Sequence, residues 1–350
     1  MIRRGDSGPA VAEIRSRLRH LGLTLDIDPI DPDVFDVALD RAVRAFQQER
    51  GITVDGVVGP QTFRRLEEAR WQLGDRVLWF NPGHLMAGDD VAELQRRLNQ
   101  LGFLAERPDG LFGRHTDEAL REFQKGVGVT ADGTCGPESF RAFDRLVRTV
   151  SGGSATTLRE QVTLIELQTG VADKVVILDP GDPSRDDLCH AIAVRVEGRL
   201  AALGTQVLLT RPALSSGEDE APDDRARAQF ANDVGADLVL SLHVARASTP
   251  KPNGLVTFYF GDARGGTHSP TGRLFAEYVQ DEVHSRTDLL DCHTHPRSWD
   301  LLRLTRMPAV RVELGYLSNE ADARRLTSPA FQDVVAEGLA AAVTRLCAPH

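Results

Sequence analysis

Lysine, paired cysteines and long apolar runs are scarce or missing in this chain of 350 residues. Lysine occurs only at positions 125, 174 and 251, and no basic block interrupts a formal net charge of -10. This acidic balance argues against nucleic acid or an anionic membrane as the main partner. We attribute the preference for arginine over lysine to genomic base composition.

The cysteines exclude a dense disulfide framework. Cys135, Cys189, Cys292 and Cys347 stand singly and form no CxxC pair, which is typical of a reducing compartment. The amino terminus leads into a polar turn without the apolar stretch of ~7 to 15 residues that a secretory signal needs. No run approaches the ~18 apolar residues of a membrane span. We therefore expect a cytoplasmic protein without a transmembrane segment.

An internal repeat occupies the first 147 residues. Phe46-Gln47 recurs 77 positions later as Phe123-Gln124, and Gly59-Pro60 recurs as Gly136-Pro137. In each copy, apolar residues at helical spacing are separated by glycine-bearing turns. The sequence predicts two small all-α domains of three short helices each, over residues 1–72 and 80–147.

These two copies resemble the peptidoglycan-binding repeat found beside many bacterial wall hydrolases. In the second copy the resemblance is carried by Asp109, Gly110, Phe112, Gly113 and Thr116. It implies that this motif binds cell-wall sugar or peptide. The alternative is that such glycines and apolar residues specify turns and core. The first copy has Pro32-Asp33 and Phe35-Asp36 at the corresponding glycine-bearing turns, which makes it the weaker binding candidate.

Strand and helix patterns alternate after a predicted linker over residues 148–173, which contains Ser151-Gly152-Gly153-Ser154. Short apolar or β-branched runs predict strands over 174–179, 205–210, 237–243, 254–260 and 309–314. Helical spacing predicts helices over 186–203, 223–234, 271–284 and 329–346. The alternation predicts an α/β domain over 174–350, with a mostly parallel sheet covered on both faces.

Polar residues lie at the carboxyl ends of these strands. Asp182 follows the first strand, His243 ends a middle one, and Glu313 lies at the end of the last. Functional residues gather at this edge of a parallel sheet. We therefore expect these side chains to converge.

This domain resembles the zinc N-acetylmuramoyl-L-alanine amidases. The resemblance is carried by Asp179-Pro180-Gly181-Asp182, by Ser241-Leu242-His243, and by the stretch from Pro308 to Tyr316. It implies a zinc ion held by two histidines and one glutamate, and a further glutamate as general base. On this match His243 is the second histidine and Glu313 is the general base. Asp182 stands at the first histidine position and Arg185 at the position of the ligand glutamate.

The substitutions at these positions weaken the case for zinc. A catalytic zinc needs three protein ligands and an open position for water, and an arginine cation cannot ligate it. We expect no bound cofactor, with a zinc ion held by Asp182, His243 and Asp186 or Asp187 as the alternative. Arg185 is expected to neutralise Asp182 and Glu313 in a salt-bridged polar cluster.

The segment Asp291-Cys292-His293-Thr294-His295 contains further candidate metal donors. They are too closely spaced to supply a tetrahedral set alone. We interpret this segment as a loop.

The order of two repeats and an amidase-like domain resembles, over nearly the whole chain, the actinobacterial CwlM-type amidase homologues. The resemblance implies a catalytically impaired cytoplasmic regulator of peptidoglycan biosynthesis. It would act with UDP-N-acetylglucosamine enolpyruvyl transferase or with lipid-linked precursors, under control of a Ser/Thr kinase. A phosphorylated tail follows the amidase domain in that family, whereas this chain stops at His350.

Two other functions stay open. One is an active zinc amidase that cleaves the muramoyl-L-alanine amide bond with an unusual Asp/His ligand set. The other is a non-catalytic wall-anchoring module in which the last domain is only structural.

Overall fold

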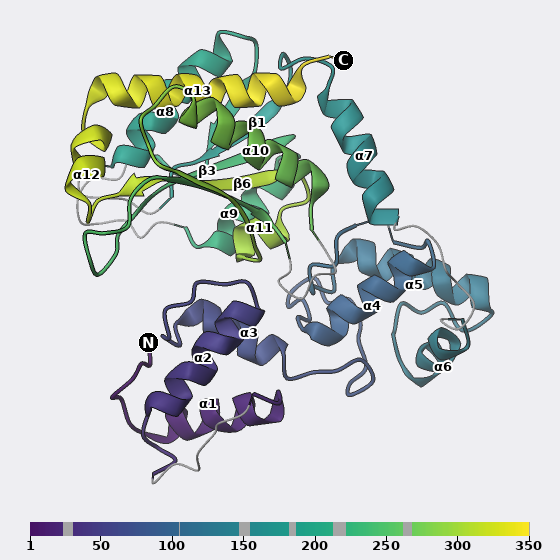
Figure 1. The fold of residues 1–350 in the computed structure, drawn as a ribbon. Helices are drawn as coiled ribbons and strands as arrows, with labels where there is room; N and C mark the ends of the chain where they lie inside the picture. The colour runs from purple at the N-terminus through teal and green to yellow at the C-terminus, as the bar shows by residue number, and fades with distance from the viewer. Residues whose placement is uncertain are drawn as a thin grey trace. The chain divides into compact units, whose positions relative to one another are not determined.

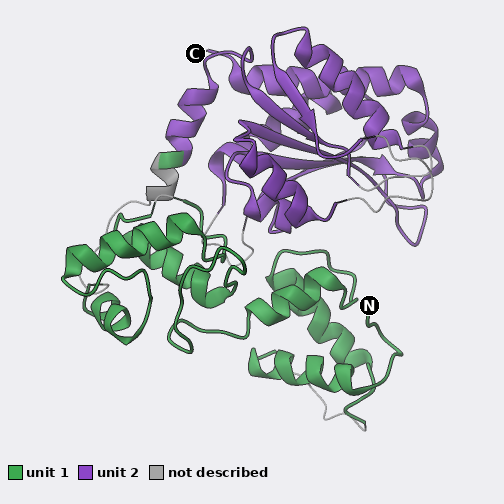
Figure 2. Ribbon diagram, turned by 180° about the vertical axis from the view of Figure 1, so that it is seen from behind, with its two compact units in different colours: residues 1–159 green, residues 160–350 purple. Residues whose placement is uncertain are grey.

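The computed structural model describes residues 1–23, 31–104, 106–146, 155–181, 187–212, 222–261 and 268–349, with the backbone alone for 155–158. The chain divides into two compact units, residues 1–159 and 160–350 (Figure 2). Within the described residues, no helix has both the length and the apolar character that crossing a bilayer requires.

The first unit contains the two repeats, and each repeat has its own core. Its helices are α1 (Pro9–His20), α2 (Val37–Glu49), α3 (Pro60–Glu68), α4 (Asp89–Gln100), α5 (Arg114–Val127) and α6 (Pro137–Leu146) (Figure 1). Leu18, Leu39 and Phe46 are buried in the first core. In the second core, the rings of Phe123 and Phe143 stack with their centroids 4.0 Å apart. The expected helical repeats are confirmed.

A buried glutamine braces the Asp-Gly turns of both repeats. Its side-chain NH2 donates to an aspartate oxygen and to a Thr or Ser hydroxyl, and its carbonyl accepts from the glycine N–H. The brace occurs as Gln47 with Asp55, Gly56 and Thr62, as Gln95 with Asp109, Gly110 and Thr116, and as Gln124 with Asp132, Gly133 and Ser139. Because each buried amide has several partners, these turns are rigidly held.

Asp36 caps the start of α2. Its Oδ1 accepts from the Leu39 N–H at 2.8 Å, and its Oδ2 lies 3.2 Å from Nη2 of buried Arg15. Burial raises the pKa of this carboxyl, but the Leu39 N–H and the Arg15 guanidinium outweigh it, so the folded-state pKa lies below its usual value. The charged form is therefore the one that stabilises the fold.

Replacing Asp36 with alanine should lower the free energy of unfolding by about 1 kcal/mol at pH 7. A depressed folded-state pKa gives stability that is complete above the unfolded pKa of about 4 and is lost as pH falls through the folded value. The difference between the wild type and Asp36→Ala should therefore shrink below pH 4 in urea titrations. A difference that stays constant down to pH 2 would contradict the assigned role of the charge.

The second unit begins within α7 (Ala155–Leu167), which lies in the segment expected to be a linker. Leu167 is buried in the core of the α/β unit, and Leu164 packs against that core. The Glu160 carboxylate accepts from the Ser269 hydroxyl at 2.7 Å, and Ser269 caps α10 (Pro270–His284). The later half of this segment is therefore an integral part of the α/β unit.

The core of the second unit is a six-stranded sheet with the order β2-β1-β3-β6-β4-β5 among the described residues. Its strands are β1 (Val175–Asp179), β2 (Gln206–Leu209), β3 (Leu238–Ala245), β4 (Leu255–Phe260), β5 (Asp291–Arg297) and β6 (Ala309–Tyr316). All neighbouring pairs are parallel except β4 and β6, which are antiparallel. The prediction of a mostly parallel sheet is confirmed.

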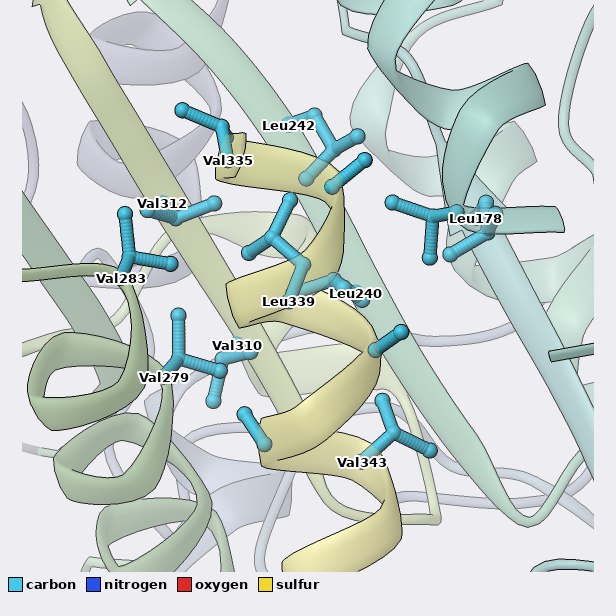
Figure 3. Close-up of a cluster of buried hydrophobic side chains, with 14 of the residues drawn as sticks. Leu178, Leu240, Leu242, Val279, Val283, Val310, Val312, Val335, Leu339 and Val343 are labelled. Carbon is cyan, nitrogen blue, oxygen red and sulfur yellow. The ribbon is translucent and has the colours of Figure 1, made fainter. Parts of the chain in front are cut away.

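Helices cover both faces of the sheet (Figure 1). One face packs on α8 (Leu188–Ala201), α10 and α13 (Pro329–Cys347). The other face is met by α9 (Asp224–Asp233) and α11 (Asp300–Leu304), while α12 (Glu320–Leu326) follows β6. Figure 3 shows Leu339 of α13 in one buried apolar cluster with Leu240 and Val310 of the sheet.

The interpretation of residues 291–295 as a loop was wrong, because they form most of β5. This strand lies at the edge of the sheet and pairs with β4 on one side. Its side chains are polar and largely exposed, and it contains Pro296, which an edge strand tolerates because one side needs no ladder. The segment therefore lacks the apolar signal of a buried strand.

Candidate active site

Strand pairing gathers polar side chains on one face of the sheet. Asp179 of β1 pairs with Ser241 of β3, and Ser241 pairs with Arg311 of β6. Two residues further along, His243 pairs directly with Glu313. Paired residues point to the same face of a sheet, and positions two apart share that face. The structure therefore brings His243 and Glu313 together at the carboxyl edge, as neighbours on adjacent strands.

The opposite face of the same strands is apolar. Leu178, Leu240, Leu242, Val310 and Val312 alternate with the polar positions and pack under α13 (Figure 3). This packing fixes the register of the strands. If a strand slipped by one residue, its polar side chains would point into the apolar core. The core thereby holds the site in position.

His243 is nearly buried and belongs to a hydrogen-bonded chain. The Ser241 hydroxyl donates to Asp179 Oδ2 at 2.5 Å, and its oxygen lies 2.9 Å from His243 Nε2. A hydroxyl has one proton, so Nε2 is the donor in this second bond and Nδ1 carries the lone pair. Burial lowers the pKa of His243 well below its usual range, and the charges of nearby arginines lower it further. The imidazole is therefore neutral.

Gly181 approaches the imidazole closely. It has a positive φ of 44°, and a Cβ at this position would lie 2.7 Å from His243 Cε1 and 2.6 Å from the Leu242 carbonyl oxygen. Only glycine fits this backbone conformation and this gap. Gly181 therefore lies directly against the edge of the ring that carries Nδ1.

Three arginine side chains surround the histidine. Arg211 donates to the carbonyls of Pro180 and Gly181 and forms a two-pronged ion pair with Asp187 at 2.7 and 2.8 Å. Arg227 of α9, which is 3% exposed, lies 3.5 Å from Asp179 Oδ2. Arg211 therefore holds Pro180 and Gly181 just after β1, and Arg227 balances the fully buried Asp179 carboxylate.

The third arginine, Arg311, is paired with Glu313. Its Nη2 lies 3.3 Å from Glu313 Oε1, and its guanidinium lies over the Trp299 ring, 4.4 Å from the centroid. Stacking on the indole restricts the guanidinium to this position. The Glu313 carboxylate, at the position that the family resemblance gives to the general base, is therefore engaged in an ion pair within the site.

Several known proteins with similar sequences are named as N-acetylmuramoyl-L-alanine amidases. A family model described as N-acetylmuramoyl-L-alanine amidase matches residues 179–345, and one described as "Putative peptidoglycan binding domain" matches residues 7–66 and 87–143. The chain is 43% identical to N-acetylmuramoyl-L-alanine amidase CwlM of Mycobacterium tuberculosis over 368 aligned residues, which cover 99% of this chain and 89% of that protein. The chain belongs to the N-acetylmuramoyl-L-alanine amidase family.

Other relatives of this amidase family member match about half of its length. The germination-specific N-acetylmuramoyl-L-alanine amidase of Bacillus subtilis is 27% identical over 201 residues, covering 50% of this chain and 80% of that protein. Among solved structures, amidase AmiC2 of Nostoc punctiforme is 27% identical over 50% of this chain and 98% of its own, with a TM-score of 0.44.

Three of the predicted metal positions of this amidase family member, Asp182, Arg185 and Asp186, lie outside the described residues. Among the described residues, no group of three or more His, Cys, Asp or Glu side chains is arranged to hold a metal ion. His243 offers one neutral nitrogen, but it lies within the fields of three guanidiniums. A zinc site needs three donors and is opposed by neighbouring positive charge. The described donor set therefore does not fit a catalytic zinc ion.

The second-repeat residues proposed to bind ligand have structural partners. Asp109, Gly110 and Thr116 all bond to Gln95 in the brace described above. Phe112 is fully buried in the core of the repeat, and Gly113 precedes α5 as its N-cap. These contacts favour the structural interpretation of the motif.

The sequence did not predict that Arg211, Arg227 and Arg311 belong to the site. Arg311 stands two positions before Glu313, and the period of two in a strand places it on the same face. Arg211 follows the end of β2, at the same carboxyl edge as His243. Arg227 has no comparable signal, because it lies inside a helix distant in sequence.

Proposed function

We propose that this member of the amidase family is catalytically impaired and regulates peptidoglycan biosynthesis by binding a cell-wall precursor or an enzyme of precursor synthesis. The observation that carries the proposal is the Arg311–Glu313 ion pair. Glu313 stands at the position that the family resemblance gives to the general base, and the Arg311 guanidinium pairs with it. His243, its neighbour on β3, is already hydrogen-bonded to Ser241. Both groups are occupied by interactions that serve the fold.

The partners we propose are UDP-N-acetylglucosamine enolpyruvyl transferase or a lipid-linked peptidoglycan precursor, in the cytoplasm, with control by a Ser/Thr kinase. Support comes from the similarity to CwlM, which extends over both repeats and the α/β unit. The partner proposal is tested by measuring turnover of the purified transferase with and without the full chain. Unchanged turnover and no binding of lipid-linked precursor would contradict it.

A second candidate function, an active zinc amidase, is favoured by one feature. The lone pair on His243 Nδ1 lies on the ring edge next to Gly181, and Gly181 precedes in the chain the position that the family resemblance gives to the first ligand. Glu313 is also retained. Zinc bound there would polarise the amide carbonyl and activate water.

Metal content and cleavage separate the two functions. We expect the full chain to purify with far less than one zinc per chain and to release no more peptide from muropeptides than its Glu313→Gln variant does. Zinc is measured by mass spectrometry after dialysis against trace zinc. One zinc per chain, with cleavage that is lost in Glu313→Gln, would establish the active amidase instead.

The Arg311→Met variant sharpens this test. Removing the guanidinium lowers the positive potential at the site, so uptake of zinc should rise relative to the wild type. Arg273→Met, which breaks an exposed ion pair with Glu277 on α10, is the matched control and should leave zinc uptake unchanged. Equal uptake in all three proteins would contradict the argument that Arg311 opposes the metal.

A further inference from the structure

A cluster of two arginines and two aromatic rings lies beside Glu313 in the α/β unit. Phe258 of β4 pairs with Arg311 of β6, and Phe260, two positions further on, pairs with Arg297 of β5. Paired residues point to the same face of a sheet, so both arginines lie on the face that carries Glu313. The two arginines come from the strands on either side of β4.

The aromatic rings hold the two guanidiniums in place. The guanidinium carbon of Arg297 lies 5.4 Å from the centroid of the Phe258 ring, and that of Arg311 lies 4.4 Å from the centroid of the Trp299 ring. The two rings meet edge to face, with their centroids 4.7 Å apart. Both rings are buried, with 7% of Phe258 and 6% of Trp299 exposed. Two cations are therefore fixed on one connected aromatic base.

The two cations outnumber the carboxylates that pair with them. Glu313 Oε1 lies 3.3 Å from Arg311 Nη2, and no carboxylate in the described part of the chain forms an ion pair with Arg297. Burial lowers the pKa of Arg297, and the charge of Glu313 opposes this shift. The neighbouring carboxylates have arginines of their own, Asp179 and Asp224 with Arg227, and Asp300 with Arg225 and Arg303. Among these described groups, the cluster has one positive charge in surplus.

Two buried donors of the cluster also lack a hydrogen-bond partner within the described ranges. They are Nε1 of Trp299 and Nε of Arg311. Both nitrogens can only donate, and a buried donor without an acceptor is unfavourable, so each needs an acceptor that the described chain does not supply. Because the guanidinium stacks on the indole, these two N–H groups lie close together.

A carboxylate group is the complement of these donors and charges. It has two acceptor oxygens for the two N–H groups and one negative charge for the surplus positive charge. Water would satisfy the donors but would leave the charge unbalanced. A diphosphate would bring more negative charge than the cluster balances, next to the Glu313 carboxylate.

We propose that Arg297, Arg311 and Trp299 form a subsite for a carboxylate group of the ligand. The bound carboxylate accepts from the Trp299 and Arg311 N–H groups, and Arg297 supplies the balancing charge. This inference deepens the proposed function and rests on it in taking the peptide part of a cell-wall precursor as the group that carries the carboxylate.

The test compares two soluble probes that differ in charge. They are N-acetylmuramoyl-L-alanyl-D-glutamic acid and the same compound with both glutamic carboxyl groups converted to amides. Calorimetry measures their binding to the full chain. The wild type should bind the acid about tenfold or more tightly than the amide. Arg297→Met should remove most of this preference, and Trp299→Phe, which keeps a ring but has no N–H, should reduce it by a smaller factor.

Three controls separate the charge effect from damage to the fold. Arg297→Lys keeps the charge and should retain part of the preference. Arg273→Met, on the exposed surface of α10, should bind both probes like the wild type. Circular dichroism checks that each variant is folded, and binding of the uncharged amide should be the same in all of them.

Equal binding of acid and amide by the wild type would overturn the inference and leave water as the partner of the two donors. An unchanged preference in Arg297→Met, or no binding of either probe, would also overturn it. Tighter binding of inorganic diphosphate than of the acid would assign the subsite to a phosphate group instead.

The zinc, cleavage and transferase measurements test the proposed function separately. A chain without zinc or cleavage that shows no preference for the acid would contradict this inference and leave the proposed function standing. Cleavage with one zinc per chain and an intact preference for the acid would contradict the proposed function alone.

Discussion

Replacing Arg227 with methionine is expected to lower the free energy of unfolding of the α/β unit by about 3 to 5 kcal/mol. Arg227 is the buried cation opposite Asp179, a carboxylate with no exposed surface. The Ser241 and Thr210 hydroxyls each donate a hydrogen bond to Asp179, at 2.5 and 2.6 Å, but these neutral groups do not balance its charge. Methionine keeps most of the volume and leaves this charge unpaired.

A double-mutant cycle isolates the charge effect. Asp179→Asn removes the negative charge, so Arg227→Met should cost less in that background than in the wild type. Denaturation is followed by Trp299 fluorescence in a Trp71→Phe/Trp79→Phe background, because Trp299 is the tryptophan of this unit. Arg273→Met is the exposed control. Equal losses for Arg227→Met and Arg273→Met would show that the buried pair has no special role.

The architecture could be predicted because its signals are local. Apolar runs of six or seven residues alternate with helical spacing in the sequence, and this alternation predicts the α/β class and the mostly parallel sheet. The two repeats were evident from recurring residues such as Phe46-Gln47 and Phe123-Gln124. The edge strand β5 was missed because His293 and His295 are exposed polar residues that carry no apolar signal.

The site could be predicted only in part. His243 and Glu313 each follow from a motif at a strand end, and parallel pairing makes them neighbours. The charge balance at the site depends on which charged side chains the tertiary fold brings close to His243 and Glu313. Arg227 comes from a helix and Arg211 from the turn after another strand, so neither position could be assigned without the tertiary structure.

The sequence also could not assign a role to the second-repeat motif that contains Asp109 and Thr116. Asp109 and Thr116 are polar residues in a glycine-bearing turn, a pattern that suits either a ligand or a turn brace. The contacts of Gln95 favour the turn brace, because its NH2 group donates to Asp109 Oδ1 and to the Thr116 hydroxyl. Sequence spacing alone does not reveal this partner, which lies on the preceding helix α4.

Replacing Leu339 with alanine should also destabilise the α/β unit strongly, by about 2 to 5 kcal/mol. Leu339 has no exposed surface and lies at the centre of α13, between Val335 and Val343 on the same helix face (Figure 3). It contacts the apolar side of the strands whose other side carries His243 and Glu313. Loss of the side chain leaves a cavity that the surrounding helices cannot fill.

The size of this effect depends on packing, and two controls separate packing from general sensitivity. Leu339→Met conserves volume and should cost less than about 1.5 kcal/mol. Val194→Ala removes a side chain that is 45% exposed on α8 and should change stability by less than about 0.5 kcal/mol. Urea unfolding followed by Trp299 fluorescence gives all three values. A loss for Leu339→Ala no larger than that for Val194→Ala would show that this contact does not hold the sheet, and with it the site, in place.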